Sequence, residues 1–220
     1  MTGKFIVFSG LDASGKTTNR EYVNAVLKSK DVKYILTREP GGTPLAEKLR
    51  ELILSKEYEI PALTELLMFY AARIDHTEKV INPYLNNGYH VLCDRYYDSS
   101  LAYQSVDCEE EVWLVHGACT SKLCKPDLTL LYDIPAELAL ERMRESRGAQ
   151  VMDRIESRGI DYFKRVRNNF LEIADCDRKT VIIDATRPLD EVTKDTWQHV
   201  SKLIGIKDES ISKDSEQFKS

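Results

Sequence analysis

The sequence predicts an α/β protein in which helices cover both faces of a five-stranded parallel sheet. Five short, apolar, β-prone segments alternate with longer segments whose apolar residues recur at helical spacing. The predicted strands are residues 5–8, 33–37, 89–93, 127–132 and 180–184. No repeat or second core is visible in the sequence, so we expect one domain over residues 1–206 and a polar tail at 207–220.

The segments between the strands carry distinct helix signals. Thr43 is expected to cap a helix that has Pro44 at its first position. One face of that helix is predicted to be apolar, with residues Leu45, Leu49, Leu52 and Ile53. A second pattern starts after Pro61 and continues towards residues 86–88. Further helices are expected after the first strand and at about 110–119, 135–147, 162–173 and 189–204.

Composition argues against several classes of protein, including nucleic-acid-binding, disulfide-rich and membrane proteins. The net charge of −5 argues against nucleic-acid binding over a broad surface. The five cysteines include no C-x-x-C pair, so we predict neither a disulfide framework nor a zinc site. The chain has no signal-peptide pattern and no apolar run of membrane length. We therefore expect a cytoplasmic protein (in the host cytoplasm if the chain is viral) that binds no membrane.

The segment Gly10-Leu-Asp-Ala-Ser-Gly-Lys-Thr-Thr18 lies between the first predicted strand and the first predicted helix. It matches G-x-x-x-x-G-K-[ST] in the context that this motif requires. Backbone N–H groups of such a loop point at phosphate oxygens, Lys16 adds a positive charge, and Thr17 supplies a hydroxyl to Mg²⁺. The motif predicts a P-loop NTPase fold and a nucleotide site.

Other charged segments follow the ends of predicted strands. They are Arg38-Glu39, Asp94-Arg95 and residues 184–188. In parallel sheets ligands bind beyond the carboxyl ends of the strands. All these segments therefore lie at the edge where the phosphate loop is expected.

Several classes of P-loop protein are compatible with this loop. The guanine-reading N-K-x-D of GTPases is absent from the sequence, and nothing else indicates a motor ATPase. A kinase for a small phosphorylated acceptor needs cations for two charged substrates and a lid that excludes water. Arginines gather around a candidate lid at about 142–158, namely Arg142, Arg144, Arg147, Arg154 and Arg158. The alternative is a solvated helix face on which arginines pair with Glu141 and Glu145.

Seven segments together resemble bacterial-type thymidylate kinases, and they run in family order over nearly the whole chain. They are the phosphate loop, Thr37-Arg-Glu-Pro-Gly-Gly-Thr43, Leu67-Met-Phe-Tyr-Ala-Ala-Arg73, Asp94-Arg-Tyr96, Ala102-Tyr-Gln104, Pro126-Asp-Leu-Thr-Leu130 and Asp153-Arg-Ile-Glu156. The resemblance implies ATP-dependent phosphorylation of dTMP to dTDP for dTTP synthesis. It also implies Mg²⁺, in-line transfer and a homodimer.

The resemblance assigns an acceptor site for dTMP. Phe69 would stack on thymine, and Arg73, one helical turn later, would hydrogen-bond a thymine carbonyl. Tyr103 would crowd the 2′ position of the sugar. The implied acceptor residues are Asp12, Arg38, Phe69, Arg73, Arg95, Ser100, Tyr103 and Gln104. For Phe69 the alternative is plain core packing, and for Asp12 it is a turn residue.

The resemblance also assigns the donor and metal sites. The implied ATP-binding residues are Gly10, Asp12, Ser14, Gly15, Lys16, Thr17, Thr18, Arg142 and Arg187. Thr17, Asp94 and Glu39 would hold Mg²⁺ and its waters, although Asp94 and Glu39 could instead pair with neighbouring arginines. The implied catalytic residues are Lys16, Arg95, Arg147 and Asp12.

The family divides by the position of the arginine that stabilises the transferred phosphoryl group. Some members carry it inside the phosphate loop, where this chain has Ala13 and Ser14. The charge must then come from the lid, and Arg147 matches that position best. The segment from Arg142 to Asp153 is longer than the family pattern, so Arg144 stays an alternative.

Two other functions remain open on sequence alone. The first is a kinase of altered base range that accepts dUMP or a 5-modified dUMP. The second is a non-catalytic nucleotide-binding protein of the same fold.

Overall fold

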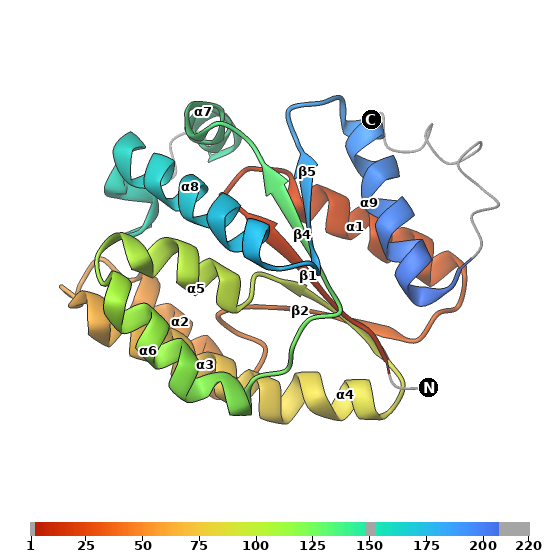
Figure 1. The fold of residues 1–220 in the computed structure, drawn as a ribbon, viewed down its shortest axis with the longest axis horizontal. Helices are drawn as coiled ribbons and strands as arrows, with labels where there is room; N and C mark the ends of the chain where they lie inside the picture. Colours follow the sequence, from red (N-terminus) through yellow and green to blue (C-terminus); the bar gives the residue numbers. More distant parts are fainter. Residues whose placement is uncertain (1–2, 148–152, 207–220) are drawn as a thin grey trace.

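A single five-stranded sheet forms the centre of the chain, in the strand order β2-β3-β1-β4-β5 with all neighbours parallel (Figure 1). The computed structural model describes residues 3–147 and 153–206, without the side chains of Ser146 and Arg147. The strands are β1 Phe5–Gly10, β2 Tyr34–Arg38, β3 His90–Asp94, β4 Leu128–Asp133 and β5 Thr180–Asp184. The predicted fold class is confirmed.

Strand β1 lies in the middle of the sheet, and every one of its residues is buried. The apolar sequence of this strand suits that position. It lies between β3 and β4, with Phe8 paired to Asp94. Arg38 of β2 is in turn paired to the same Asp94. The carboxyl ends of β1, β2 and β3 therefore meet at one edge, and the loops that follow them lie together.

Helices cover the sheet in two layers (Figure 1). α1 (Lys16–Ser29) and α9 (Leu189–Ile204) pack together on one face. α5 (Tyr97–Tyr103) and α8 (Ile160–Cys176) pack together on the other, with α3 (Ala62–His76) and α6 (Glu109–Cys119) against α5. α7 spans Ala136–Arg147 and contacts α8. None of the helices in the described part combines the length and apolar character that a membrane span needs.

Helix α2 (Pro44–Leu54) begins as predicted, because the Thr43 hydroxyl accepts a hydrogen bond from the Ala46 N–H at 3.1 Å. Only part of the predicted apolar face is buried. Ala46 and Ile53 are buried, whereas Leu45 and Leu52 are 52% and 43% exposed. The leucine stripe therefore points largely away from the core.

The pattern after Pro61 forms one nearly continuous helical path, as predicted. α3 passes into a π-helical turn at Thr77–Ile81 and then into α4 (Asn82–Asn86). Short 3₁₀ turns occupy Gln104–Val106, Thr120–Lys122 and Glu156–Arg158. The sequence pattern does not predict α5, because its first turn is polar and the helix is only seven residues long.

Candidate active site

The phosphate loop joins β1 to the first turn of α1. Gly10 and Gly15 have φ values of 129° and 94°, which favour glycine. A Cβ on Gly10 would also lie 2.4 Å from the Tyr132 carbonyl oxygen of β4. The Lys16 ammonium donates to the carbonyl oxygens of Gly10 and Leu11 at 3.1 and 2.6 Å. The loop therefore holds its lysine on its own backbone.

Lys16 is almost completely buried, and this burial changes its titration. Burial, followed by repulsion from the nearby Arg95, lowers the pKa of Lys16 to about 8. Asp12 and Asp94 act in the opposite direction. A phosphate anion would supply the negative charge that favours the protonated amine.

Arg95 connects β3 to the phosphate loop. Its backbone is left-handed, with φ 67°, and its guanidinium donates to the Gly10 carbonyl oxygen at 3.0 Å and to Asp12 Oδ1 at 2.6 Å. It also donates to the Tyr103 hydroxyl at 3.3 Å. Burial is the largest single effect and lowers the pKa of Arg95, but Asp12, Tyr103 and Asp94 together raise it well above its usual value. Arg95 therefore stays a cation beside the loop.

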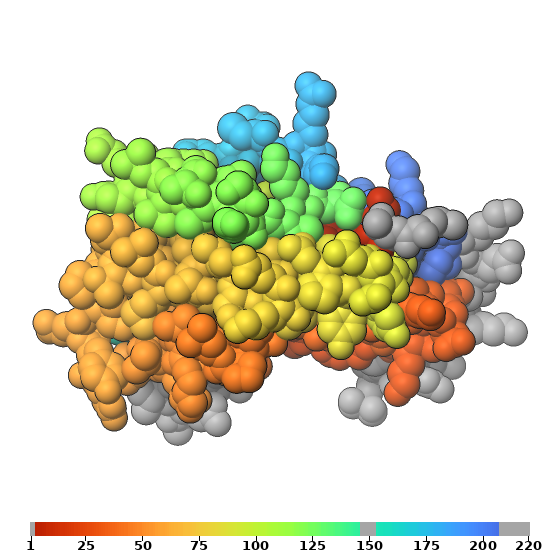
Figure 2. Space-filling model, turned by 90° about the horizontal axis from the view of Figure 1, so that it is seen from below, coloured from red at the N-terminus to blue at the C-terminus, as the bar shows by residue number. Residues whose placement is uncertain are grey.

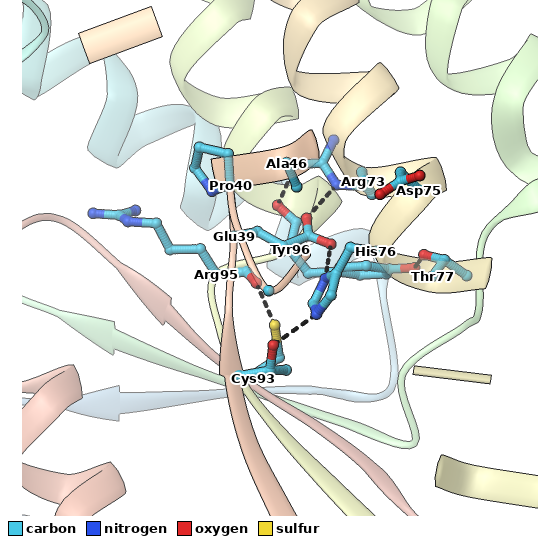
Figure 3. Close-up of polar contacts among 12 residues, drawn as sticks. Glu39, Pro40, Ala46, Arg73, Asp75, His76, Thr77, Cys93, Arg95 and Tyr96 are labelled. Carbon is cyan, nitrogen blue, oxygen red and sulfur yellow. Dashed lines mark hydrogen bonds and ion pairs between the residues drawn. The ribbon is translucent and has the colours of Figure 1, made fainter. Parts of the chain in front are cut away.

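A second buried cation, Arg73, comes from α3 (Figure 3). Its Nε donates to Glu39 Oε2 at 2.6 Å, and its Nη2 donates to the Tyr96 carbonyl oxygen at 3.2 Å and the Ser100 hydroxyl at 3.0 Å. Among the described residues, nothing accepts a hydrogen bond from its buried Nη1. An unpaired buried donor is costly, so Nη1 is suited to an acceptor on a ligand.

A cavity of about 120 Å³ is lined by both Arg73 and Arg95. Seven of the eight predicted acceptor residues line it: Asp12, Phe69, Arg73, Arg95, Ser100, Tyr103 and Gln104. The eighth, Arg38, instead pairs with Glu47 at 2.9 Å and lines a neighbouring cavity.

That neighbouring cavity lies over the phosphate loop. Its lining includes the predicted donor and metal residues Asp12, Gly15, Lys16, Thr17, Thr18, Glu39, Asp94 and Arg142. Four residues line both cavities, namely Asp12, Glu39, Arg50 and Arg95. The two cavities therefore share one charged wall.

The residues around Thr17 fit a magnesium ion. Asp94 Oδ1 is buried without a hydrogen-bond partner in the described part of the chain, while its Oδ2 lies 3.4 Å from Arg20. Thr17 is exposed at the start of α1. The described residues contain no cluster of three or more metal-ligating side chains. Mg²⁺ suits such a site because it keeps several waters and shares its ligands with substrate phosphates.

Glu39, the third predicted metal residue, is held differently. It is buried, with Oε2 bonded to Arg73 and Oε1 lying 3.0 Å from His76 Nδ1. The alternative of pairing with an arginine is therefore realised, although the partner is Arg73 rather than the adjacent Arg38.

Two of the predicted ATP-binding residues, Arg142 and Arg187, lie beside the loop after β5. The Arg142 guanidinium lies 3.4 Å from the Ala185 carbonyl oxygen. Arg187 pairs with Asp195 at 2.6 Å and donates to the Asp184 carbonyl oxygen at 3.0 Å. Arg187 does not line either cavity.

The predicted lid lies only partly within the described residues. Residues 148–152 and the side chain of Arg147 fall outside them. Arg154 pairs with Glu65 and donates to the Ile53 carbonyl oxygen at 3.1 Å. Arg158 forms a bidentate pair with Asp107, and Arg144 is exposed. The predicted tail at 207–220 also lies outside the described residues.

Comparison with known proteins identifies the family. A sequence model described as thymidylate kinase matches residues 8–196. The chain is 43% identical over 210 residues to the thymidylate kinase of Ligilactobacillus salivarius, which covers 93% of this chain and 100% of that protein. It is 44% identical over 209 residues to that of Haemophilus ducreyi, which covers 93% of this chain and 96% of that protein. The chain belongs to the thymidylate kinase family.

Three residues of this family member were missed by the sequence analysis. Arg50 of α2 lines both cavities, and burial beside Arg38 lowers its pKa. Glu65 accepts a hydrogen bond from Gln104 at 2.8 Å and pairs with Arg154. His76 contacts Glu39. Glu65 had a signal in the sequence, as a charged residue among the leucines of α3.

Proposed function

We propose that this member of the thymidylate kinase family transfers the γ-phosphoryl group of ATP to dTMP, forming ADP and dTDP. The proposal depends on one observation, namely that the two cavities share part of their lining. Asp12 and Arg95 face both the phosphate loop and the cavity of Arg73. In-line transfer requires the donor and acceptor phosphates to meet at one point lined by cations. In this proposal the two phosphates meet beside the shared residues Asp12 and Arg95.

We propose that the base of dTMP occupies the end of the cavity formed by α3 and α5. The free Nη1 of Arg73 would donate to a carbonyl oxygen of thymine. Phe69, which is half-buried and lines the same cavity, would stack on the ring. Tyr103 is buried beside Arg95 and would exclude a 2′-hydroxyl.

On the donor side, Lys16 and Arg95 would neutralise charge on the phosphates, each contributing about 3–4 kcal/mol to transition-state stabilisation. Thr17 and Asp94, with Glu39 nearby, would hold Mg²⁺, which supplies further neutralisation of the β- and γ-phosphates. Ala13 and Ser14 carry no charge in the loop. We therefore propose that Arg147 completes the site.

We also propose that the protein acts as a cytoplasmic homodimer. Apolar side chains are exposed on neighbouring helices: Leu63 and Leu67 of α3, and Trp113 and Leu114 of α6. These two helices pack together and run along one face, where α6 is green and α3 orange to yellow (Figure 2). An exposed apolar face of this kind suits an interface between copies.

A coupled assay of ADP release tests the activity. The acceptors are dTMP, dUMP, 5-modified dUMP analogues and no acceptor, each with ATP and Mg²⁺. We expect release to depend on dTMP and to be highest with it. Preference for dUMP or a modified analogue would indicate the altered base range, and no acceptor-dependent release would exclude a kinase.

The lid arginine is tested by substitution. Arg147→Ala should lower turnover by about 10²–10³-fold with little change in the KM values, because the charge acts mainly in the transition state. Arg144→Ala is the matched control. If Arg144→Ala lost turnover while Arg147→Ala kept it, the role would pass to Arg144.

A further inference from the structure

His76 lies at the end of α3, behind the cation that faces the acceptor cavity (Figure 3). Its ring is fully buried and bonded at both nitrogens. Nδ1 lies 3.0 Å from Glu39 Oε1, and Nε2 lies 2.6 Å from the Thr37 hydroxyl. His76 does not line either of the two cavities described above. Any effect of His76 on a ligand must therefore pass through its neighbours.

The partners of His76 determine which nitrogen carries the proton in the neutral ring. A carboxylate only accepts hydrogen bonds, so Nδ1 must donate to Glu39. Nε2 is then the acceptor, and the Thr37 hydroxyl donates to it. Thr37 and Glu39 both belong to the segment at the end of β2, so His76 ties α3 to that segment by two directed bonds.

The space around His76 is closed by Gly42. A Cβ on Gly42 would lie 2.5 Å from the His76 ring and 2.8 Å from the Thr37 hydroxyl. Gly42 also has a φ of 83°, which disfavours other residues. The backbone of the loop thus packs directly on the ring, which restricts its rotation.

The carboxylate of Glu39 is shared between Arg73 and His76. Arginine and carboxylate prefer a bidentate pair, in which both carboxylate oxygens accept from Nε and Nη2. Here His76 engages Oε1, and only Oε2 accepts from Arg73 Nε. Nη2 bonds the Tyr96 carbonyl oxygen and Ser100, and Nη1 is buried without a hydrogen-bond partner among the described residues.

We propose that His76 is a positioning residue for acceptor recognition. By holding the Glu39 carboxylate through Oε1, it fixes the position of Oε2 and thereby of the Arg73 guanidinium at the wall of the acceptor cavity. The proposal rests on the proposed function for the identity of the acceptor, dTMP. Its effect is on dTMP binding, because Arg73 lines the acceptor cavity and not the cavity over the phosphate loop.

Two substitutions separate the two bonds of the ring. Asn places its amide nitrogen near the position of Nδ1, so His76→Asn keeps a donor for Glu39. Gln places its polar atoms near Nε2, so His76→Gln keeps the contact with Thr37 and loses the donor for Glu39. His90→Gln is the matched control, because His90 Nδ1 accepts from the Lys4 N–H at 2.9 Å at the opposite end of β3.

Calorimetry measures the Kd of dTMP and of an ATP analogue for each folded protein, with thermal unfolding as a check. We expect His76→Gln to weaken dTMP about 10-fold, as for one charge-assisted hydrogen bond, and to leave the ATP analogue unchanged. His76→Asn should recover most of the affinity. In an Arg73→Lys background, His76→Gln should weaken dTMP no further.

Three outcomes would overturn the proposal. They are equal dTMP affinity in wild type and His76→Gln, equal losses in His76→Gln and His76→Asn, and a parallel loss of affinity for the ATP analogue. An additive loss in the Arg73→Lys background would show that His76 does not act through Arg73. Because the readout is binding, failure of the proposed function appears separately, as no dTMP-dependent ADP release by wild type.

Discussion

The proposed acceptor end and the proposed donor end of the site are built in different ways. At the acceptor end, Arg73, Ser100 and Gln104 are almost completely buried and bonded to neighbours from other elements. At the donor end, Thr17 and Thr18 are exposed, and Lys16 is bonded to its own loop. The proposed acceptor end is thus largely preformed, whereas we expect the charge of a ligand to complete the proposed donor end.

The difference follows from how each end is connected. The acceptor end brings together the segment after β2, the helix α3 and the helix α5, and their packing holds each polar group. The donor end is one loop between β1 and α1, whose backbone amides need an anion. Most polar groups buried between elements are satisfied by the fold, whereas the amides of the phosphate loop can be satisfied by a ligand.

The largest expected effect concerns the buried pair of Arg73 and Glu39. Arg73→Met leaves the Glu39 carboxylate buried without its cation, so the free energy of unfolding should fall by about 3–5 kcal/mol. Urea denaturation measures it. Adding Glu39→Gln should restore part of the loss.

The control for that comparison is an exposed pair. Arg187→Met removes the partner of Asp195 at the surface and should cost at most about 1 kcal/mol. Equal losses in Arg73→Met and Arg187→Met would mean that the acceptor end is not held by its buried charges.

Arg95 lies on the wall between the two ends, so its removal should affect turnover most. Arg95→Ala should lower kcat by about 10²–10³-fold, because the cation faces the point where charge develops. Lys48→Ala, which removes an exposed partner of Glu51, should leave kcat unchanged. A loss confined to KM in Arg95→Ala would restrict Arg95 to substrate binding.

A smaller effect should appear in the pH dependence of ATP binding. With its pKa lowered to about 8, Lys16 is charged below pH 8 and becomes neutral above it. Phosphate favours the charged amine, so ATP binding above pH 8 takes up a proton and weakens about 10-fold per pH unit.

Calorimetry at pH 7.5 and 9 in two buffers of different ionisation enthalpy measures this proton uptake. Lys16→Arg keeps its charge at both values and should show none. The same uptake in wild type and Lys16→Arg would assign the titration to another group.

The sequence predicts the strands, most helices and the phosphate loop well, because each depends on residues that are close in the sequence. Strand and helix patterns require only near neighbours, and the phosphate loop is a contiguous motif. The ends of parallel strands meet at one edge, so the grouping of Lys16, Asp94 and Arg95 follows from topology alone. The seven predicted acceptor residues that line one cavity were assigned by the family resemblance, and most of them lie on helices rather than at strand ends.

The missed features depend on packing between distant segments. The leucines of α2 resemble a core face, but Leu45 and Leu52 are exposed, and Arg50 turns to the cavities. Hydrophobic periodicity does not distinguish a core from an interface between copies. His76 and Glu39 are 37 positions apart, so a pattern of neighbouring residues cannot predict their contact.

Amide hydrogen exchange under each ligand tests the contrast between the two ends most directly. We predict that dTMP leaves the exchange of residues 39–43 and of α3 nearly unchanged, because that end is already formed. An ATP analogue with Mg²⁺ should slow exchange strongly in residues 11–18. Strong new protection of residues 39–43 and α3 by dTMP, with little change at 11–18 under the ATP analogue, would contradict the account.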